Sequence, residues 1–200
     1  MLFYVPQAIT MKKLGLLYVV TDETEQTTVI EKCLKEHNPE TIVRVICISG
    51  RHLFREQWMP NGKPCPLHKL ATEGKLDVIM PRSHPENQTI LRRHATYSEL
   101  FKRANGIESV DSFITEIEAG KRFLRHYGNT VREHDILCMW RVIILSSHSI
   151  VQSYFPNKSK TESFRAPMFV YSTGAPEEHF DSYYNTHTQM FELVSLGCQP

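Results

Sequence analysis

The chain has 200 residues, of which 41% are hydrophobic and 22% are charged, and its formal net charge at pH 7 is +1. This length and composition are typical of a soluble globular protein, and they predict a single domain over residues 1–200. A nearly neutral chain lacks the basic surface to which nucleic acids and anionic membranes bind, so the composition argues against both kinds of partner.

The first half of the chain predicts three strands and a helix. Residues 14–20 form an apolar run of strand length, and residues 24–37 carry apolar side chains at helical spacing. Residues 42–48 are β-branched and apolar apart from one arginine, which predicts a central strand, and residues 76–80 predict a shorter one. The polar segment 50–63 lies between these two strands and is typical of loops that carry function.

The second half predicts two helices and three strands. Apolar side chains recur at helical spacing in residues 89–104 and 110–124, and each segment predicts a helix. Residues 136–145 form the most apolar run of the chain and predict a strand, and residues 168–171 and 190–194 predict two short ones.

These elements together predict the fold class. Six strands with helices between some of them favour an α+β fold, in which one mixed or antiparallel sheet packs against helices. We expect the helices at 24–37 and 89–104 to pack on this sheet, and the strands at 42–48 and 136–145 to be its most buried.

The cysteines and histidines limit the compartment and the metal chemistry. Five cysteines without the spacing of a disulfide framework predict reduced thiols and a cytoplasmic protein. Pro6 and the pair Lys12-Lys13 interrupt the apolar N-terminal residues, so we expect neither a secretory signal nor a membrane span. No histidine falls at zinc-site spacing from a cysteine or an acidic residue, and we expect no metal.

A cysteine between two prolines is the first candidate for chemistry. Cys65 lies on a backbone that Pro64 and Pro66 make stiff and extended. Arg82 and Ser83 follow the strand at 76–80 and offer a guanidinium and a hydroxyl, a pairing suited to phosphate oxygens. This combination suggests covalent chemistry on a phosphorylated metabolite. The other interpretation, which these residues alone favour, is a buried cysteine in a turn and an arginine on the surface.

The order of several short motifs resembles the thymidylate synthase family, which includes the deoxycytidylate hydroxymethylases. The resemblance extends from about residue 24 to the C-terminus. Its landmarks, in chain order, are Asn38-Pro39-Glu40-Thr41 before a strand, Trp58-Met59-Pro60, Pro64-Cys65, Arg82-Ser83, Ala95-Thr96-Tyr97, Ser147-His148-Ser149 and Phe191-Glu192-Leu193-Val194.

The resemblance implies a role for each matching residue. In that family a cysteine thiolate adds to C6 of a pyrimidine nucleotide, and the carbanion at C5 then attacks the one-carbon unit of methylenetetrahydrofolate. Cys65 matches the nucleophile, and Arg82 and Ser83 match the pair that holds the nucleotide phosphate and lowers the pKa of the thiol. His148 matches a histidine that orients the nucleotide, and Tyr97 matches a tyrosine of the substrate site.

Other positions depart from the family pattern. Arg93 stands where the family has the Asn or Asp that reads the pyrimidine edge, and Pro85 replaces the Asp that serves the folate. Arg44 lies one residue from the position of the arginines that reach the partner subunit's phosphate, which places it on the other strand face. Trp58, in the long loop, is a candidate for stacking on a base or for covering the core.

Two functions therefore follow from the resemblance. The first is a divergent enzyme that acts on or binds a pyrimidine nucleoside monophosphate by C5 methyl or hydroxymethyl transfer, with methylenetetrahydrofolate put in doubt by Pro85. The family forms dimers by packing sheets back to back, so the resemblance implies a homodimer. The second is a catalytically degenerate structural or regulatory subunit, which would form a heterodimer with an active relative.

Overall fold

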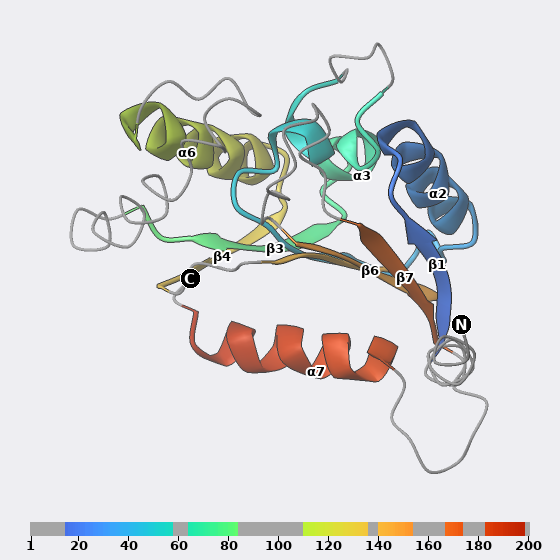
Figure 1. Cartoon of the computed structure of the whole chain (residues 1–200). Coiled ribbons are helices and arrows are strands. Elements are labelled where there is room, and N and C mark those ends of the chain that lie inside the picture. Colours follow the sequence, from blue (N-terminus) through green and yellow to red (C-terminus); the bar gives the residue numbers. More distant parts are fainter. Residues whose placement is uncertain are drawn as a thin grey trace.

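A seven-stranded mixed sheet with helices on both faces organises the molecule (Figure 1). The computed structural model describes residues 15–57, 64–83, 110–135, 140–153, 167–173 and 183–198. The elements, in chain order, are β1 (Leu16–Val20), α2 (Glu23–Lys35), β2 (Val43–Ile46), the π-helical turn η1 (Arg51–Arg55), α3 (His68–Thr72), β3 (Leu76–Pro81), α6 (Val110–His126), β4 (Thr130–His134), β5 (Trp140–Ile144), β6 (His148–Ser153), β7 (Met168–Ser172) and α7 (Tyr183–Leu196).

The sheet combines a parallel part with an antiparallel part. Its strand order is β1-β7-β6-β5-β2-β3-β4. Strands β2, β3 and β4 are parallel, so all three end at the same edge, which we call the carboxyl edge. The remaining pairs are antiparallel, and β5 consequently begins at the carboxyl edge. This arrangement confirms the predicted α+β class and its mixed sheet.

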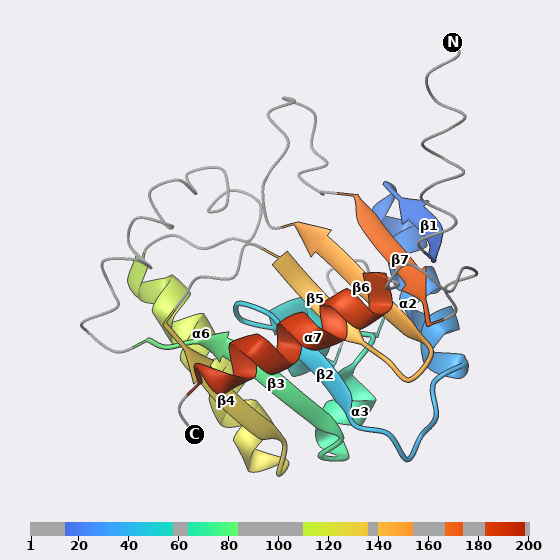
Figure 2. The ribbon, with the colours of Figure 1, turned by 90° about the horizontal axis from the view of Figure 1, so that it is seen from below.

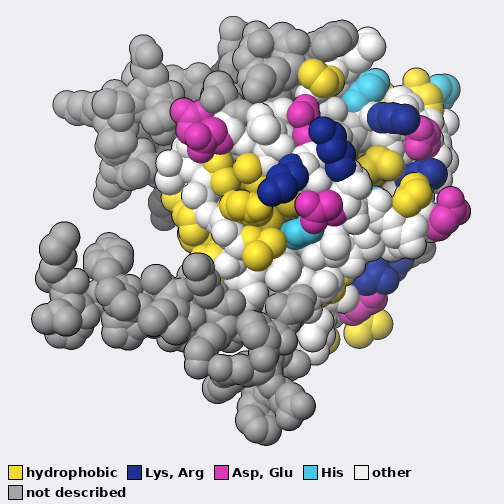
Figure 3. All heavy atoms as spheres, turned by 90° about the vertical axis from the view of Figure 1, so that its right-hand side faces the viewer, with side chains coloured by type: hydrophobic (Ala, Val, Ile, Leu, Met, Phe, Trp, Pro, Cys, Tyr) yellow, Lys and Arg dark blue, Asp and Glu magenta, His cyan; other side chains and the backbone are white. Residues whose placement is uncertain are grey.

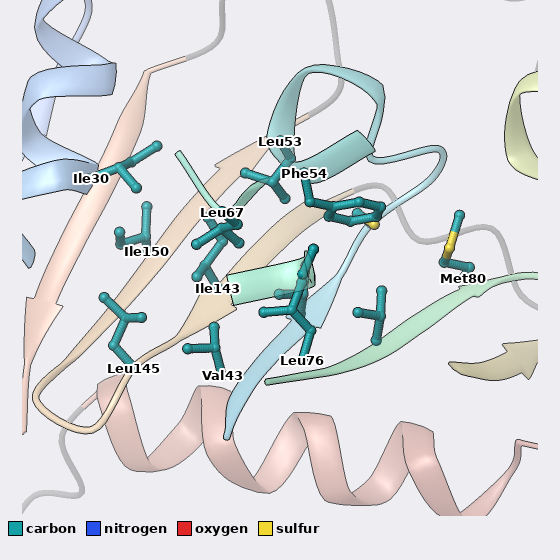
Figure 4. Close-up of a cluster of buried hydrophobic side chains, with 14 of the residues drawn as sticks. Ile30, Val43, Leu53, Phe54, Leu67, Leu76, Met80, Ile143, Leu145 and Ile150 are labelled. Carbon is teal, nitrogen blue, oxygen red and sulfur yellow. The ribbon is translucent and has the colours of Figure 1, made fainter. Parts of the chain in front are cut away.

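Each face of the sheet has its own core because side chains alternate along a strand. Helices α2, α3 and α6 cover one face, and α7 crosses the other face diagonally (Figures 1 and 2). On β2, Val43 and Val45 point into the larger core, whereas Ile46 points into the smaller core under α7. In the larger core, Phe54 of η1 and Leu67 lie against the strands (Figure 4).

Most of the elements predicted from the sequence are confirmed. The strands at 14–20, 42–48, 76–80 and 168–171 correspond to β1, β2, β3 and β7, and the helices at 24–37 and 110–124 correspond to α2 and α6. The described part of segment 136–145 is β5, which lies beside β2 at the centre of the sheet. The helix at 89–104 lies outside the described residues. Among the helices of the described ranges, none has the length and hydropathy that crossing a membrane requires.

The strand predicted at residues 190–194 is wrong, because this segment lies inside α7. Phe191 is buried, and Met190 and Val194 pack beside it against the sheet, whereas Leu193 is 70% exposed. The three inward side chains recur at helical spacing. Leu193 is also apolar although it points outward, so in the sequence the segment looks like a continuous apolar run of strand length.

Helix α7 covers part of the sheet face through which the dimer implied by the resemblance would pack. The core beneath it includes Ile46, Ile79 and Val142, so this sheet face is already covered over β2, β3 and β5. Polar contacts add to the packing, including a hydrogen bond of 2.7 Å from Arg132 to the Ser195 hydroxyl. A dimer of this chain would therefore need a surface other than either of the two covered sheet faces.

A glycine in α6 allows this helix to approach the sheet closely. A Cβ atom on Gly120 would lie 2.4 Å from the backbone oxygen of Ser49, well inside van der Waals contact. We predict that Gly120→Ala lowers the free energy of unfolding by about 1–3 kcal/mol through overpacking, although alanine favours helices by about 1 kcal/mol. Urea denaturation measures this change.

Gly197→Ala is the matched control for that substitution. A Cβ atom on Gly197 would make only ordinary contacts of 3.6 Å or longer, and we expect a change within about 0.5 kcal/mol. Equal stability of Gly120→Ala and the wild-type protein would show that α6 does not depend on this close approach.

A half-buried histidine of α7, on the side that faces the sheet, predicts a loss of stability in acid. The ring of His187 lies 2.8 Å from the Ser149 hydroxyl at Nδ1 and packs against Tyr171 and Tyr183, and burial lowers its pKa to about 4. Because the unfolded chain takes up this proton near pH 6.5, stability is full above that pH and falls towards pH 4. Between pH 7 and pH 5 the linkage amounts to about 2 kcal/mol.

The substitution His187→Gln tests this linkage. Urea denaturation of the variant should show a smaller decrease between pH 7 and pH 5 than the wild-type protein, by about 2 kcal/mol. Burial also lowers the pKa of His37 and His148, so some acid sensitivity should persist. An unchanged difference between the two pH values would contradict the assignment to His187.

Candidate functional site

The carboxyl edge gathers most of the charged side chains that form networks in the described residues. Strand β3 continues into Arg82 and Ser83, β4 continues into Asp135, and the chain after β2 turns through Gly50 into η1. Helix α6 runs beside this edge and contributes Glu116, Glu118 and Lys121 to the networks described below.

A fully buried lysine forms the inner network. The ammonium group of Lys121 donates to the Ser83 hydroxyl at 3.1 Å, to Glu118 at 3.0 Å and to Glu133 at 2.7 Å. These bonds use all three of its donors, which a buried ammonium requires. Ser83 in turn donates to Glu118. Ser83 is therefore held between a cation and a carboxylate.

Both carboxylates of the inner network stay ionised. Burial alone would raise the pKa of Glu118, but hydrogen bonds from Ser83 and Lys121 outweigh it and lower this pKa. In the same way, hydrogen bonds from Lys121 and Arg125 outweigh burial and lower the pKa of Glu133. The network thus carries two negative charges beside the Lys121 ammonium, and Arg125 binds Glu133 at 2.8 Å from the outside.

Arg82 belongs to an outer ion pair. Its guanidinium lies 3.0 Å from one Asp135 oxygen and 3.2 Å from the other, and its backbone N–H donates to the carbonyl of His134. The Asp135 side chain is 54% exposed, so water screens this pair. A phosphate would offer Arg82 the same oxygen geometry with more charge.

A third cluster lies where η1 meets α6. Arg51 Nε lies 2.6 Å from Glu56, and Arg55 lies 2.5 Å from Glu116 of α6. Here the hydrogen bond to Glu56 is the largest cause of a raised pKa of Arg51. This cluster connects η1 to the helix that also carries Lys121.

Cys65, the predicted nucleophile, lacks the environment of a reactive thiol. Its side chain is buried, and its backbone N–H donates to the carbonyl of Gln57 at 3.0 Å. Burial is the main cause that raises its pKa, to about 11, and the negative charge of Glu56 adds to the effect. The cation that the resemblance places beside this thiol, Arg82, is paired with Asp135 instead.

His148 and Arg44 lie apart from Arg82 and Ser83. Strand β5 runs away from the carboxyl edge and β6 pairs with it antiparallel, so β6 begins with His148 at the opposite edge. Strands of this length separate the two edges by about 15 Å. His148 is buried, with Ser147 at 2.8 Å and Glu36 at 3.6 Å, and burial lowers its pKa although Glu36 opposes this.

Arg44 lies on the face that α7 covers. It forms an ion pair of 2.9 Å with Glu192 and lies over the ring of Phe191. Both residues belong to α7, whereas His148 points to the α2 side of the sheet. Of the predicted site residues that the structure describes, Arg82 and Ser83 are neighbours at the carboxyl edge, whereas His148 and Arg44 lie elsewhere. Trp58, Arg93 and Tyr97 lie outside the described residues.

The face formed by β1 and α2 offers no comparable convergence of polar groups. Figure 3 shows hydrophobic side chains there beside a mixture of basic and acidic ones. Leu17 and Val19 of β1 are 47% and 51% exposed. Because the visible charges have both signs, this face lacks the basic patch that nucleic acid would require.

The sequence did not identify Lys121, Glu133 or Asp135 as site residues. The spacing of Glu118 and Lys121 on a helix was the one available signal, because residues three apart lie on the same helix surface. Glu133 and Asp135 gave no signal, since β4 itself was not predicted. No group of three His, Cys, Asp or Glu side chains with the geometry of a metal site occurs within the described ranges.

Comparisons of the chain with protein-family models, with curated proteins and with solved structures found no match. The resemblance to the thymidylate synthase family consequently stays a prediction. The arrangement at the carboxyl edge has to be interpreted from its own chemistry.

The environment of Cys65 predicts slow alkylation. With a pKa of about 11, about one Cys65 thiol in a thousand is ionised at pH 8, and the thiolate is the nucleophile. Peptide mass spectrometry after treatment with iodoacetamide should show slower labelling of Cys65 than of the half-buried Cys198. In 8 M urea the two cysteines should react at similar rates, and faster native labelling of Cys65 would contradict the prediction.

Proposed function

We propose that this protein binds a phosphorylated small molecule at the carboxyl edge, with Arg82 and Ser83 as the phosphate contacts. A pyrimidine nucleoside monophosphate is the first ligand to test, because the resemblance implies it. The observation that carries the proposal is the position of Arg82 and Ser83 at the end of β3, beside the Lys121 ammonium.

The position of these residues supports a binding site. In open sheets that contain parallel strands, ligands bind outside the carboxyl ends of those strands, where successive loops converge. Here β2, β3 and β4 all end at this edge. Arg82 follows β3 directly, so its backbone is fixed by the sheet before any ligand arrives.

Among the charges at the edge, the outer pair of Arg82 and Asp135 supports an anion as the ligand. The buried Lys121 ammonium cannot leave its two carboxylates without a large desolvation cost, so its network holds Ser83 in a fixed position. The Arg82–Asp135 pair is exposed on the Asp135 side and is worth about 0–1 kcal/mol, so a phosphate can replace Asp135 at little cost. At this site the Arg82 guanidinium can thus exchange the Asp135 carboxylate for a phosphate.

Binding without transfer fits the state of Cys65. Methyl or hydroxymethyl transfer would require a thiolate, and burial together with Glu56 raises the pKa of this thiol to about 11. The position that the resemblance assigns to the folate, residue 85, lies outside the described residues. These observations support the catalytically degenerate alternative, in which the domain binds a nucleotide as a structural or regulatory subunit.

The transferase function has a direct test. Tritium release from C5 of deoxyuridylate and deoxycytidylate measures the addition of a thiolate to C6. Release that depends on Cys65, and is lost in Cys65→Ala, would replace the binding function with the enzymatic one.

Two substitutions with opposite effects test the phosphate site. Arg82→Ala removes a charge-assisted contact, and calorimetry should show deoxyuridylate or deoxycytidylate binding weakened by about 1.5–3 kcal/mol. Asp135→Asn removes the competing carboxylate, and binding should become stronger by about 0.2–1 kcal/mol.

Arg122→Ala is the control for Arg82→Ala, because Arg122 is an exposed arginine of α6 outside the three networks. It should leave the dissociation constant within about twofold of the wild-type value. No binding of either nucleotide at millimolar concentration, or equal binding by Arg82→Ala and the wild-type protein, would reject the proposed function.

A further inference from the structure

A serine, a histidine and a glutamate meet at the edge of the sheet opposite the carboxyl edge. Ser147 Oγ lies 2.8 Å from Nδ1 of His148, and Nε2 of the same ring lies 3.6 Å from the Glu36 carboxylate. Glu36 follows α2 directly, and His148 is the first residue of β6. A hydroxyl within hydrogen-bonding distance of a base that a third group orients is the arrangement of an activated nucleophile.

The turn before β6 allows these two neighbouring residues to contact each other. Successive side chains within a strand point to opposite faces and cannot meet. Ser147 precedes β6 and does not belong to it, so its hydroxyl can reach the ring of the next residue. Ser147 is partly exposed, whereas His148 is buried. The serine is thus accessible to a substrate, and the base beside it is shielded from water.

The Glu36 carboxylate decides which ring nitrogen of His148 carries the proton. A carboxylate only accepts hydrogen bonds, so it favours the neutral tautomer with the proton on Nε2. Nδ1 then keeps its lone pair and faces the Ser147 hydroxyl at 2.8 Å. The hydroxyl also lies 3.3 Å from the Glu36 carbonyl oxygen, which is the longer of these two contacts. Nδ1 is therefore placed to take the Ser147 proton.

The adjacent pair of Ser146 and His37 shows a contrasting arrangement, in which the base is occupied. Ser146 Oγ lies 3.1 Å from Nδ1 of His37, but the backbone N–H of Ser146 donates to this nitrogen at 3.0 Å. Nε2 of His37 lies 3.0 Å from the carbonyl oxygen of Thr41 and therefore carries the ring proton. Both nitrogens are committed to backbone groups, so His37 cannot take a proton from Ser146.

We propose that Ser147 is the nucleophile of a site that hydrolyses carboxylic esters, with His148 as its general base and Glu36 as a positioning residue. Ser147 Oγ attacks the carbonyl carbon of the ester while its proton moves to Nδ1 of His148. The bond between the acyl carbon and the alcohol oxygen then breaks, and the alcohol leaves with that proton. Water attacks the acyl group on Ser147 in the same way, which releases the carboxylic acid and restores the serine.

A fluorophosphonate tests the nucleophile directly, because an activated serine displaces the fluoride and keeps the phosphorus group. Peptide mass spectrometry of the full chain, treated at about pH 8, should find this group on Ser147 and not on Ser146. His148→Gln should slow the labelling about 100-fold or more, since a positioned base contributes about 10²–10⁴-fold.

Ser146→Ala is the matched control, because it removes the neighbouring hydroxyl of the same turn and leaves His148 in place. It should leave the labelling rate of Ser147 nearly unchanged. Circular dichroism verifies that each variant is folded, and labelling of the wild-type protein in 8 M urea should be lost, because the reactivity depends on the folded arrangement.

The pH dependence of labelling tests the role of Glu36. Burial lowers the pKa of His148, the negative charge of Glu36 raises it, and the positive charge of Lys32 lowers it. Labelling should increase with pH as His148 becomes the free base. In Glu36→Gln the pKa of His148 is lower, so the midpoint of this increase should move to lower pH. A purely structural role of Glu36 would change the rate and leave the midpoint in place.

An ester substrate tests the complete reaction. 4-Nitrophenyl acetate should give a burst of 4-nitrophenol followed by steady turnover, and Ser147→Ala should lose both. The proposal is overturned if Ser147 is labelled no faster in the folded than in the unfolded chain, if His148→Gln reacts like the wild-type protein, or if Ser147 is labelled but releases no nitrophenol. Calorimetry measures nucleotide binding at Arg82 separately, so none of these outcomes affects the proposed function.

Discussion

The buried ammonium of Lys121 is the interaction on which the carboxyl edge depends. A charge removed from water costs several kcal/mol unless it is fully paired and hydrogen-bonded. Its three acceptors come from the end of β3, from β4 and from α6 itself, so satisfying this one group fixes the relative positions of all three elements. The adjacent Gly120 has the same effect on packing, because its missing side chain lets α6 reach the backbone at Ser49.

The charged groups at the edge divide into the inner network around Lys121 and the outer pair of Arg82 and Asp135. This division explains why the Arg82 side chain is available to a ligand. Glu118 and Glu133 are committed to Lys121, and Arg125 covers Glu133 from outside, so these groups cannot reorganise without exposing a buried charge. Among the described residues, the carboxylate with which Arg82 pairs is that of Asp135, whose side chain is 54% exposed. The inner network therefore acts as the rigid support, and the outer pair is the exchangeable part.

The sequence predicted those elements whose burial follows a simple pattern. The largely apolar runs of β2 and β3, each interrupted by one charged residue, and the helical spacing in α2 and α6 are direct consequences of packing against one or two layers. Strand β4 was missed because two of its five residues, Arg132 and Glu133, are charged and find partners in Asp77 and Lys121. Those partners are 55 and 12 residues away in the chain, and no local pattern reveals such pairs.

The family resemblance rested on the order of motifs along the chain, and order does not determine proximity. Strand β5 runs antiparallel to β2 and ends at the edge opposite Arg82, where β6 begins with His148, so two landmarks of one expected site are separated. Ligand binding would not lower the pKa of the Cys65 thiol either. Burial and Glu56 raise the pKa of Cys65, and a phosphate bound at Arg82 would remove neither cause. Anion binding at Arg82 therefore leaves Cys65 a protonated, buried thiol, which favours a site that recognises a nucleotide over one that modifies it.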